Sequence, residues 1–255
     1  MTKLEYIEEL KKALIKLMSN GEEYFFTSLY LPKNDDNFYN YSQDYLIQKL
    51  KYKYDYWFEI DAENFSIELN LGLEIKNIFR NNKIPEYINN LDANSFEIVS
   101  SLLFKKIFNN LLFEENRQGC DDGIDFYGYY NSDGEVGKIT NFFQKNTWYI
   151  GQVKKYSYKN TIGTKYIREL LGTIELAKHN IWSLKDSYTN LNIKQNEAII
   201  PIFLISSRYS SVVIDISKRL GIKLLDDIDL IFWLTILYKG NLDTLQNDVE
   251  KWSYK

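Results

Sequence analysis

Apolar residues recur at two different spacings along this chain. Where they are three and four positions apart they share one face of a helix, and this spacing predicts six helices. Asn94 or Ser95 is placed to cap the one that begins near Phe96. The helices expected from the spacing cover residues 3–18, 65–79, 96–110, 164–179, 210–220 and 229–238.

Strands are predicted where β-branched and aromatic residues gather between turn residues. Residues 198–205 form a continuous apolar run, which is typical of a strand covered on both faces. Further strands are expected at 125–130, 147–156 and 222–225. The long segment between the first two of these, residues 131–146, is interpreted as an extended hairpin that turns at Asp133-Gly134.

Strands alternating with helices predict an α/β fold in which helices flank a mixed central sheet. Pro85 and the stretch Leu91-Asp92-Ala93-Asn94, which resembles a linker into a capped helix, favour a boundary and give a domain of residues 92–255. Residues 1–91 are expected to form a smaller, mainly helical domain that recognises DNA or joins subunits.

Composition excludes several classes of protein. A hydrophobic content of 45% and an aromatic content of 16% allow a substantial core and exclude a disordered chain. No apolar run approaches about 18 residues and the N-terminus lacks a secretory signal, so a cytoplasmic protein without a membrane span is expected. The single cysteine, Cys120, excludes an internal disulfide, and with the single histidine, His179, it argues against Cys- or His-rich metal sites and Cys–His catalysis. His179 is expected at a helix C-terminus.

The net charge of −4 is unusual for a DNA-binding protein, but the charge is unevenly distributed. Residues 154–178 are locally basic, with only Glu169 and Glu175 as acidic members. We expect this segment to face a nucleic acid. The candidate phosphate contacts in it are Lys155, Lys159, Lys165 and Arg168.

The residues best suited to bind a metal or act in catalysis lie in two segments. These are the turn Gly119-Cys120-Asp121-Asp122-Gly123-Ile124-Asp125 and the segment Gln152-Val153-Lys154. Successive side chains of a strand alternate between faces, so Gln152 and Lys154 share a face and Val153 points to the other. If Asp125 begins a neighbouring strand, a carboxylate, an amide oxygen and an ammonium group meet. Mg²⁺ needs only one or two carboxylates besides substrate and water, and a lysine can position the attacking water.

The order Glu97, Asp122-Gly123-Ile124-Asp125 and Gln152-Val153-Lys154 resembles the Mrr-type branch of the PD-(D/E)XK nucleases, in its Q-x-K form. The resemblance covers roughly residues 92–235. It implies a restriction-endonuclease-like fold and Mg²⁺-dependent cleavage of double-stranded DNA, with Mn²⁺ able to substitute, in bacterial restriction or phage defence. It further implies that Asp125, Glu97 and the Gln152 side-chain oxygen bind the metal, and that Lys154 orients the attacking water. The working form would be a homodimer or a partner subunit of a defence system.

The chain departs from that family where its Gly-Gly is replaced by Asp122-Gly123. Asp121, Asp122 and Asp125 therefore compete for the metal role. Asp125 is favoured because it follows Ile124 and opens an apolar run. Two other functions remain open: a nucleic-acid-binding protein with a catalytically inactive nuclease-like fold, and an interaction subunit in which the N-terminal region is the functional part.

Overall fold

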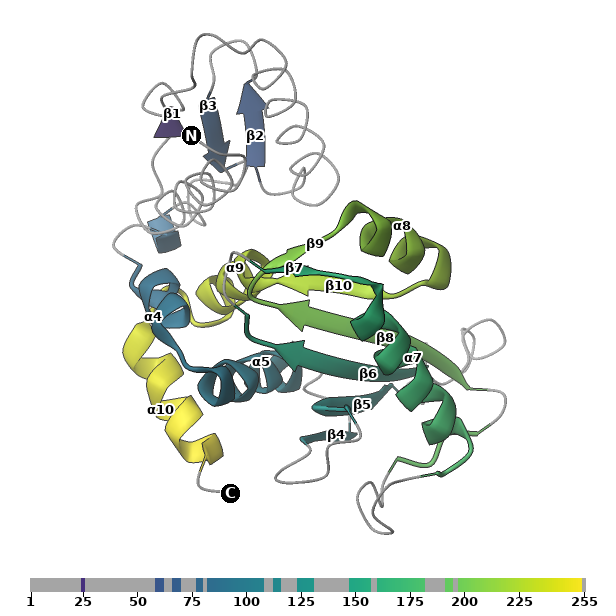
Figure 1. Ribbon diagram of the computed structural model, residues 1–255. Helices are drawn as coiled ribbons and strands as arrows, with labels where there is room; N and C mark the ends of the chain where they lie inside the picture. Colours follow the sequence, from purple (N-terminus) through teal and green to yellow (C-terminus); the bar gives the residue numbers. More distant parts are fainter. Residues whose placement is uncertain are drawn as a thin grey trace, which may run out of the picture. The chain divides into compact units, whose positions relative to one another are not determined.

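A computed structural model of the chain describes residues 24–25, 58–61, 66–69, 77–79, 82–107, 112–115, 123–130, 147–156, 160–181, 191–194 and 197–253 (Figure 1). The chain divides into two compact units, one of residues 1–90 with 231–248 and the other of residues 91–230 with 249–255. The division at residue 91 into a recognition domain and a nuclease domain stays a prediction. None of the described helices combines the length and the apolar character that a membrane span requires.

The first unit contains a small antiparallel sheet in the strand order β1–β3–β2. Its strands are β1 (Tyr24–Phe25), β2 (Phe58–Asp61) and β3 (Ser66–Leu69), and helix α4 (Ile84–Asn90) follows. The helix predicted over residues 65–79 is therefore wrong at Ser66–Leu69. There polar and apolar residues alternate, and pairing with β2 on one side and β1 on the other favours the extended chain over the helical spacing counted across a longer window. The helix predicted over residues 3–18 lies outside the described residues.

The second unit is built on a mixed five-stranded sheet in the order β10–β8–β6–β5–β4. The strands β6, β8 and β10 run parallel, β5 pairs antiparallel with β6, and β4 pairs antiparallel with β5. The strands are β4 (Leu112–Glu115), β5 (Phe126–Tyr130), β6 (Thr147–Lys154), β8 (Ala198–Ile205) and β10 (Lys223–Asp226). A mixed central sheet flanked by helices was predicted and is confirmed, although β4 was not foreseen. The hairpin expected at 131–146 lies outside the described residues.

Helices cover both faces of this sheet (Figure 1). Apolar side chains of α7 (Thr164–Lys178) and α8 (Ser211–Leu220) pack with Ile150 and Phe203 into one core. On the other face lies α5 (Ala93–Ile107), whose Phe104 ring stacks on Phe126 with 4.2 Å between centroids. The Phe126 ring fills the space above Gly151, where an added Cβ would lie 1.9 Å from the ring. Strand β6 is thus fixed between two helical layers.

Shorter elements complete the chain. The two-residue strands β7 (Thr161–Ile162) and β9 (Arg208–Tyr209) pair in parallel. The helices α9 (Asp227–Leu237) and α10 (Leu242–Ser253) end the described chain. The strand and helices predicted at 222–225, 210–220 and 229–238 are confirmed to within a few residues, whereas α10 was not predicted.

The cap predicted for α5 needs correction. The helix begins at Ala93, and the Asp92 carboxylate accepts a hydrogen bond from the Ser95 backbone N–H at 2.7 Å. Asp92 is therefore the capping residue, not Asn94 or Ser95, because the helix starts earlier than the apolar spacing indicated. The hydrogen bonds from Ser95 also lower the pKa of the Asp92 carboxyl.

Glu197 lies just before β8, and its carboxylate connects neighbouring strands of the sheet. Its carboxylate accepts hydrogen bonds from Trp148 Nε1 at 2.7 Å, from Tyr129 Oη at 3.0 Å and from the Lys194 backbone N–H at 2.9 Å. Trp148 is buried, so its indole N–H depends on this acceptor. One carboxylate therefore connects β5, β6 and the segment that leads into β8.

We expect Glu197→Ala to lower the free energy of unfolding by about 1–3 kcal/mol, because the buried indole N–H of Trp148 loses its acceptor. Urea denaturation followed by tryptophan fluorescence measures the change. The matched control is Glu175→Ala, which removes an exposed carboxylate and should change the free energy of unfolding far less than Glu197→Ala does. Equal unfolding midpoints for the two variants would contradict the role given to Glu197.

Candidate active site

Strands β5 and β6 bring the two predicted motifs together. Phe126 pairs with Gly151 across the antiparallel ladder, and the Asp125 backbone N–H donates to the Gly151 carbonyl at 2.9 Å. The Asp125 carboxylate accepts a hydrogen bond from the Val153 backbone N–H at 2.5 Å. Asp125 therefore closes the ladder with its side chain, and its carboxylate is held against the Gln152-Val153-Lys154 segment.

Lys154 lies beside the same carboxylate. Its Nζ is 3.9 Å from Asp125 Oδ2, and the exposed fractions of the two side chains are 31% for Lys154 and 13% for Asp125. The carboxylate is thus largely screened from solvent, while the ammonium group is still reached by water. At 3.9 Å the ammonium group of Lys154 is near enough to balance the charge of the Asp125 carboxylate. The distance is too long for a hydrogen bond, so this contact does not fix the lysine side chain.

Gln152 provides the third group. Its side chain is 6% exposed, and Oε1 has no hydrogen-bond partner among the described residues. A buried acceptor without a partner costs about 1–3 kcal/mol, so such an atom needs a compensating role. The Gln152 oxygen is accordingly suited to accept a bond from water or to bind a cation.

Gly123 joins the acidic turn to this site. Its φ of +77° is a conformation that side chains disfavour, and an added Cβ would lie 3.1 Å from Gln152 Nε2 and 3.4 Å from Thr173 Oγ1. The turn, strand β6 and helix α7 therefore meet around the Gln152 amide. Sequence reasoning did not identify Thr173. The available signal was a polar residue beside the apolar positions Leu170 and Ile174 of α7.

The remaining predicted metal ligand, Glu97, lies in the second turn of α5 and is half-buried. Lys155 ties the start of this helix to the end of β6, because its Nζ donates to the Leu91 carbonyl and lies 5.7 Å from the centroid of the Phe96 ring. Glu97 therefore belongs to a helix that begins where β6 ends. Among the described residues no three Asp, Glu, His or Cys side chains form a group that could hold a metal ion. Asp121 and Asp122 lie outside the described residues.

The predicted phosphate contacts differ in their surroundings. Lys155 is engaged with α5, Arg168 is exposed, and Lys159 lies outside the described residues. Lys165 is also exposed, and its Nζ is 3.6 Å from Glu169 Oε1 one turn later in α7. Such an exposed pair is weak, so Lys165 can exchange Glu169 for another anion at little cost.

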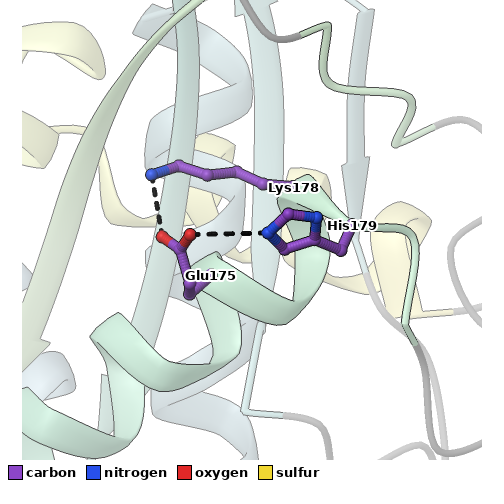
Figure 2. A network of polar contacts seen from close by, with 3 residues as sticks. All are labelled: Glu175, Lys178 and His179. Atoms are coloured by element: carbon purple, nitrogen blue, oxygen red, sulfur yellow. Dashed lines mark hydrogen bonds and ion pairs between the residues drawn. The ribbon is translucent and has the colours of Figure 1, made fainter.

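The C-terminus of α7 carries a small charged cluster (Figure 2). Glu175 accepts a hydrogen bond from Lys178 at 2.9 Å and lies 3.7 Å from His179 Nε2. Lys178 chiefly, with His179, lowers the pKa of the Glu175 carboxyl. His179 caps α7, as predicted, and belongs to this exposed cluster.

Ser206 holds the chain immediately after Lys154. Its hydroxyl accepts from the Tyr156 backbone N–H at 2.8 Å and donates to the Tyr156 carbonyl at 2.9 Å, while its own N–H donates to the Lys154 carbonyl at 3.2 Å. The end of β6 is therefore clamped to the end of β8. The sequence indicated only that the apolar strand ends in serines.

Three solved structures are similar to this chain, and all are restriction endonucleases. The MspJI restriction endonuclease in complex with a 27-mer oligonucleotide is 13% identical over 69% of this chain, with a TM-score of 0.45. The DNA modification-dependent restriction endonuclease AspBHI is 13% identical over 73%, with a TM-score of 0.43. FokI bound to DNA is 9% identical over 95%, with a TM-score of 0.34.

The chain spans 35%, 41% and 47% of the lengths of those three proteins. All three TM-scores are below 0.5, so these matches do not by themselves establish a shared activity. No protein-family model matches the sequence, and no curated protein matches it.

We expect Gly123→Ala to reduce stability more than Gly221→Ala does. Both glycines have a left-handed φ, +77° and +70°, so both substitutions bear about 1–2 kcal/mol of backbone strain. Only at Gly123 does the new methyl group meet Gln152 and Thr173, because nothing lies within 4 Å of a Cβ at Gly221. Urea unfolding measures the difference, and the side-chain amide signal of Gln152 in NMR spectra should shift in Gly123→Ala alone. The same loss in both variants, with an unmoved Gln152 signal, would contradict the contact.

Proposed function

We propose that this chain is a metal-dependent endonuclease that hydrolyses phosphodiester bonds of double-stranded DNA. The observation that carries the proposal is the Lys154 ammonium group beside the Asp125 carboxylate at the end of β6, with the buried, partnerless Gln152 Oε1 two residues earlier in the described strand. The Mrr-type resemblance supports a role for this activity in bacterial restriction or phage defence, and the composition of the chain favours the cytoplasm. It also favours a homodimer or a partner subunit as the working form.

The oxygen atoms at this site suit a hard cation such as Mg²⁺, with Mn²⁺ able to substitute. A carboxylate accepts at about four positions, so the bond from Val153 to Asp125 does not prevent Asp125 from also holding a cation. Gln152 Oε1 adds a neutral oxygen that has no partner among the described residues. Two protein oxygens are sufficient when substrate phosphate and water supply the rest. Glu97 enters this set through the family resemblance.

A bound Mg²⁺ would polarise the scissile phosphate and lower the pKa of a coordinated water. The residues of the chain supply the positioning. The Val153 N–H and the end of the β5–β6 ladder hold the Asp125 carboxylate in one orientation. Lys154, which remains partly exposed, orients the attacking water and offsets the charge that develops on the phosphate oxygens.

We expect Asp125→Asn and Lys154→Met to abolish Mg²⁺-dependent nicking of plasmid DNA while the protein stays folded. Asn keeps an oxygen for the Val153 N–H and removes only the charge, and Met keeps the length of the Lys side chain without its ammonium group. Gln152→Leu should lose activity because no oxygen remains, whereas Gln152→Glu should keep it or change the metal preference.

The control for these variants is Arg219→Met, which removes an exposed positive charge on α8, outside the basic segment 154–178, and should leave nicking unchanged. Circular dichroism verifies folding in each case. Full activity in Asp125→Asn or Lys154→Met would overturn the proposed site. A folded wild-type protein that binds DNA without cutting it under any divalent cation would instead favour an inactive binding protein.

Lys165→Ala and Arg168→Ala should each weaken DNA binding and reduce the magnitude of the salt slope by about 0.9, as expected for one lost phosphate contact each. Lys155→Ala should behave differently and reduce stability, because Lys155 anchors α5 through Leu91. Binding titrations over a range of salt concentrations, paired with urea unfolding, separate the two effects. An unchanged slope in both of the first two variants would place the DNA on another surface.

A further inference from the structure

Two tyrosines lie next to the proposed catalytic site and have no part in the chemistry described so far. Tyr156 follows Lys154 by two residues, and Tyr166 lies in the first turn of α7. Their rings are in contact, with centroids 5.6 Å apart and planes tilted by 55°. Both residues are half-buried and pack against the core, so each keeps part of its surface open to solvent.

We propose that Tyr156 and Tyr166 form a stacking platform for one unpaired nucleobase of the DNA strand held at Lys154. This inference rests on the proposed nuclease function and names the form of DNA that the site prefers: a strand in which a base near the cleaved phosphate is displaced or unpaired.

The position of the platform fits that substrate. Two residues of extended chain span at most about 7 Å, so Tyr156 lies close to the Lys154 backbone. Tyr166 and Thr173 are seven residues apart in α7, or about 10 Å along the helix axis, and Thr173 adjoins the Gly123–Gln152 contact. Helix α7 therefore runs from the tyrosines to the catalytic amide. A base on the tyrosines and a phosphate at Lys154 would be roughly one or two nucleotides apart.

The platform is also held rigidly, which lowers the conformational-entropy cost of binding a base. Ser206 holds both the N–H and the carbonyl of Tyr156. A tyrosine hydroxyl is neutral at neutral pH and does not repel phosphate. Burial, followed by a hydrogen bond with Tyr166, raises the pKa of the Tyr156 hydroxyl further.

The cationic surroundings favour a nucleic acid over other flat apolar ligands. Lys165 Nζ lies 6.0 Å from the centroid of the Tyr166 ring, at the limit of a cation–π contact, and its side chain is 78% exposed. Arg168 is exposed on the next part of the same helix. Aromatic rings beside exposed cations are the arrangement by which proteins bind unpaired strands, since every base offers a π-face and every nucleotide a phosphate.

The test compares two oligonucleotide duplexes of the same sequence, one fully paired and one with a single unpaired 2-aminopurine. Full-length protein is titrated with each in EDTA, and binding is followed by anisotropy and by 2-aminopurine fluorescence. The variants are Tyr156→Leu and Tyr166→Leu, which lose the π-face, and Tyr156→Phe and Tyr166→Phe, which keep it. Circular dichroism and urea unfolding verify that each variant is folded.

We expect wild-type protein to prefer the duplex with the unpaired base and to quench its fluorescence. The Leu variants should lose roughly tenfold in affinity for that duplex and less than twofold for the paired one, while the Phe variants stay within twofold of wild type on both. Equal losses on the two duplexes, or no loss on either, would overturn the platform. If a Leu variant unfolds, the wild-type protein and the Phe variants provide the test. A wild-type protein that does not prefer the duplex with the unpaired base overturns the platform, whatever the variants do.

Plasmid nicking in Mg²⁺ is measured in parallel and separates this inference from the proposed function. Preference for the unpaired base without any nicking supports the platform and rejects the nuclease. Nicking without such a preference supports the nuclease and rejects the platform.

Discussion

The hydrogen bond from the Val153 N–H to the Asp125 carboxylate is the interaction on which the candidate site depends. At this rung a side chain replaces the backbone carbonyl that would otherwise continue the ladder between β5 and β6. The replacement has two effects at once. It ends the pairing of the strands without leaving a buried N–H unsatisfied, and it fixes a carboxylate beside Gln152 and Lys154. Structural and chemical roles of Asp125 are thus inseparable in the wild-type chain, and an alanine at this position would remove both.

Sequence reasoning located the central elements well where one spacing dominated. The continuous apolar run at residues 198–205 coincides with β8, and the helical spacing that begins at Thr164 marks the start of α7. It failed where two signals overlapped. Ser66–Leu69 carries a short alternation inside a longer helical pattern, and only pairing with β1 and β2 decides between them. Strand β4, only four residues long at the sheet edge, gives no comparable signal.

The site itself was predictable in part for similar reasons. Alternation along β6 places Gln152 and Lys154 on one face, and the antiparallel pairing of β5 with β6 brings Asp125 to Lys154. What a single sequence does not contain is the identity of neighbours that are distant along the chain. Thr173 approaches Gly123 across fifty positions, and Ser206 holds Tyr156 from another strand. The dual character of Lys155 has the same origin, because its basic charge suggests phosphate whereas its actual partners are Leu91 and Phe96.

The close approach of Gly123 to Gln152 has a consequence for how this candidate site can be altered or transferred to another protein. Gly123 packs so closely against Gln152 of β6 and Thr173 of α7 that there is little room for even one added methyl group. Neither Gly123 nor the β6 segment would therefore keep this packing if it were moved without the other. A protein engineer who grafts the Gln152-Val153-Lys154 segment onto another scaffold would need to carry the glycine turn and the matching part of α7 with it. By the same logic, exchange of the amide for a bulkier group during evolution requires a compensating change in the helix, so the three segments are expected to diverge together.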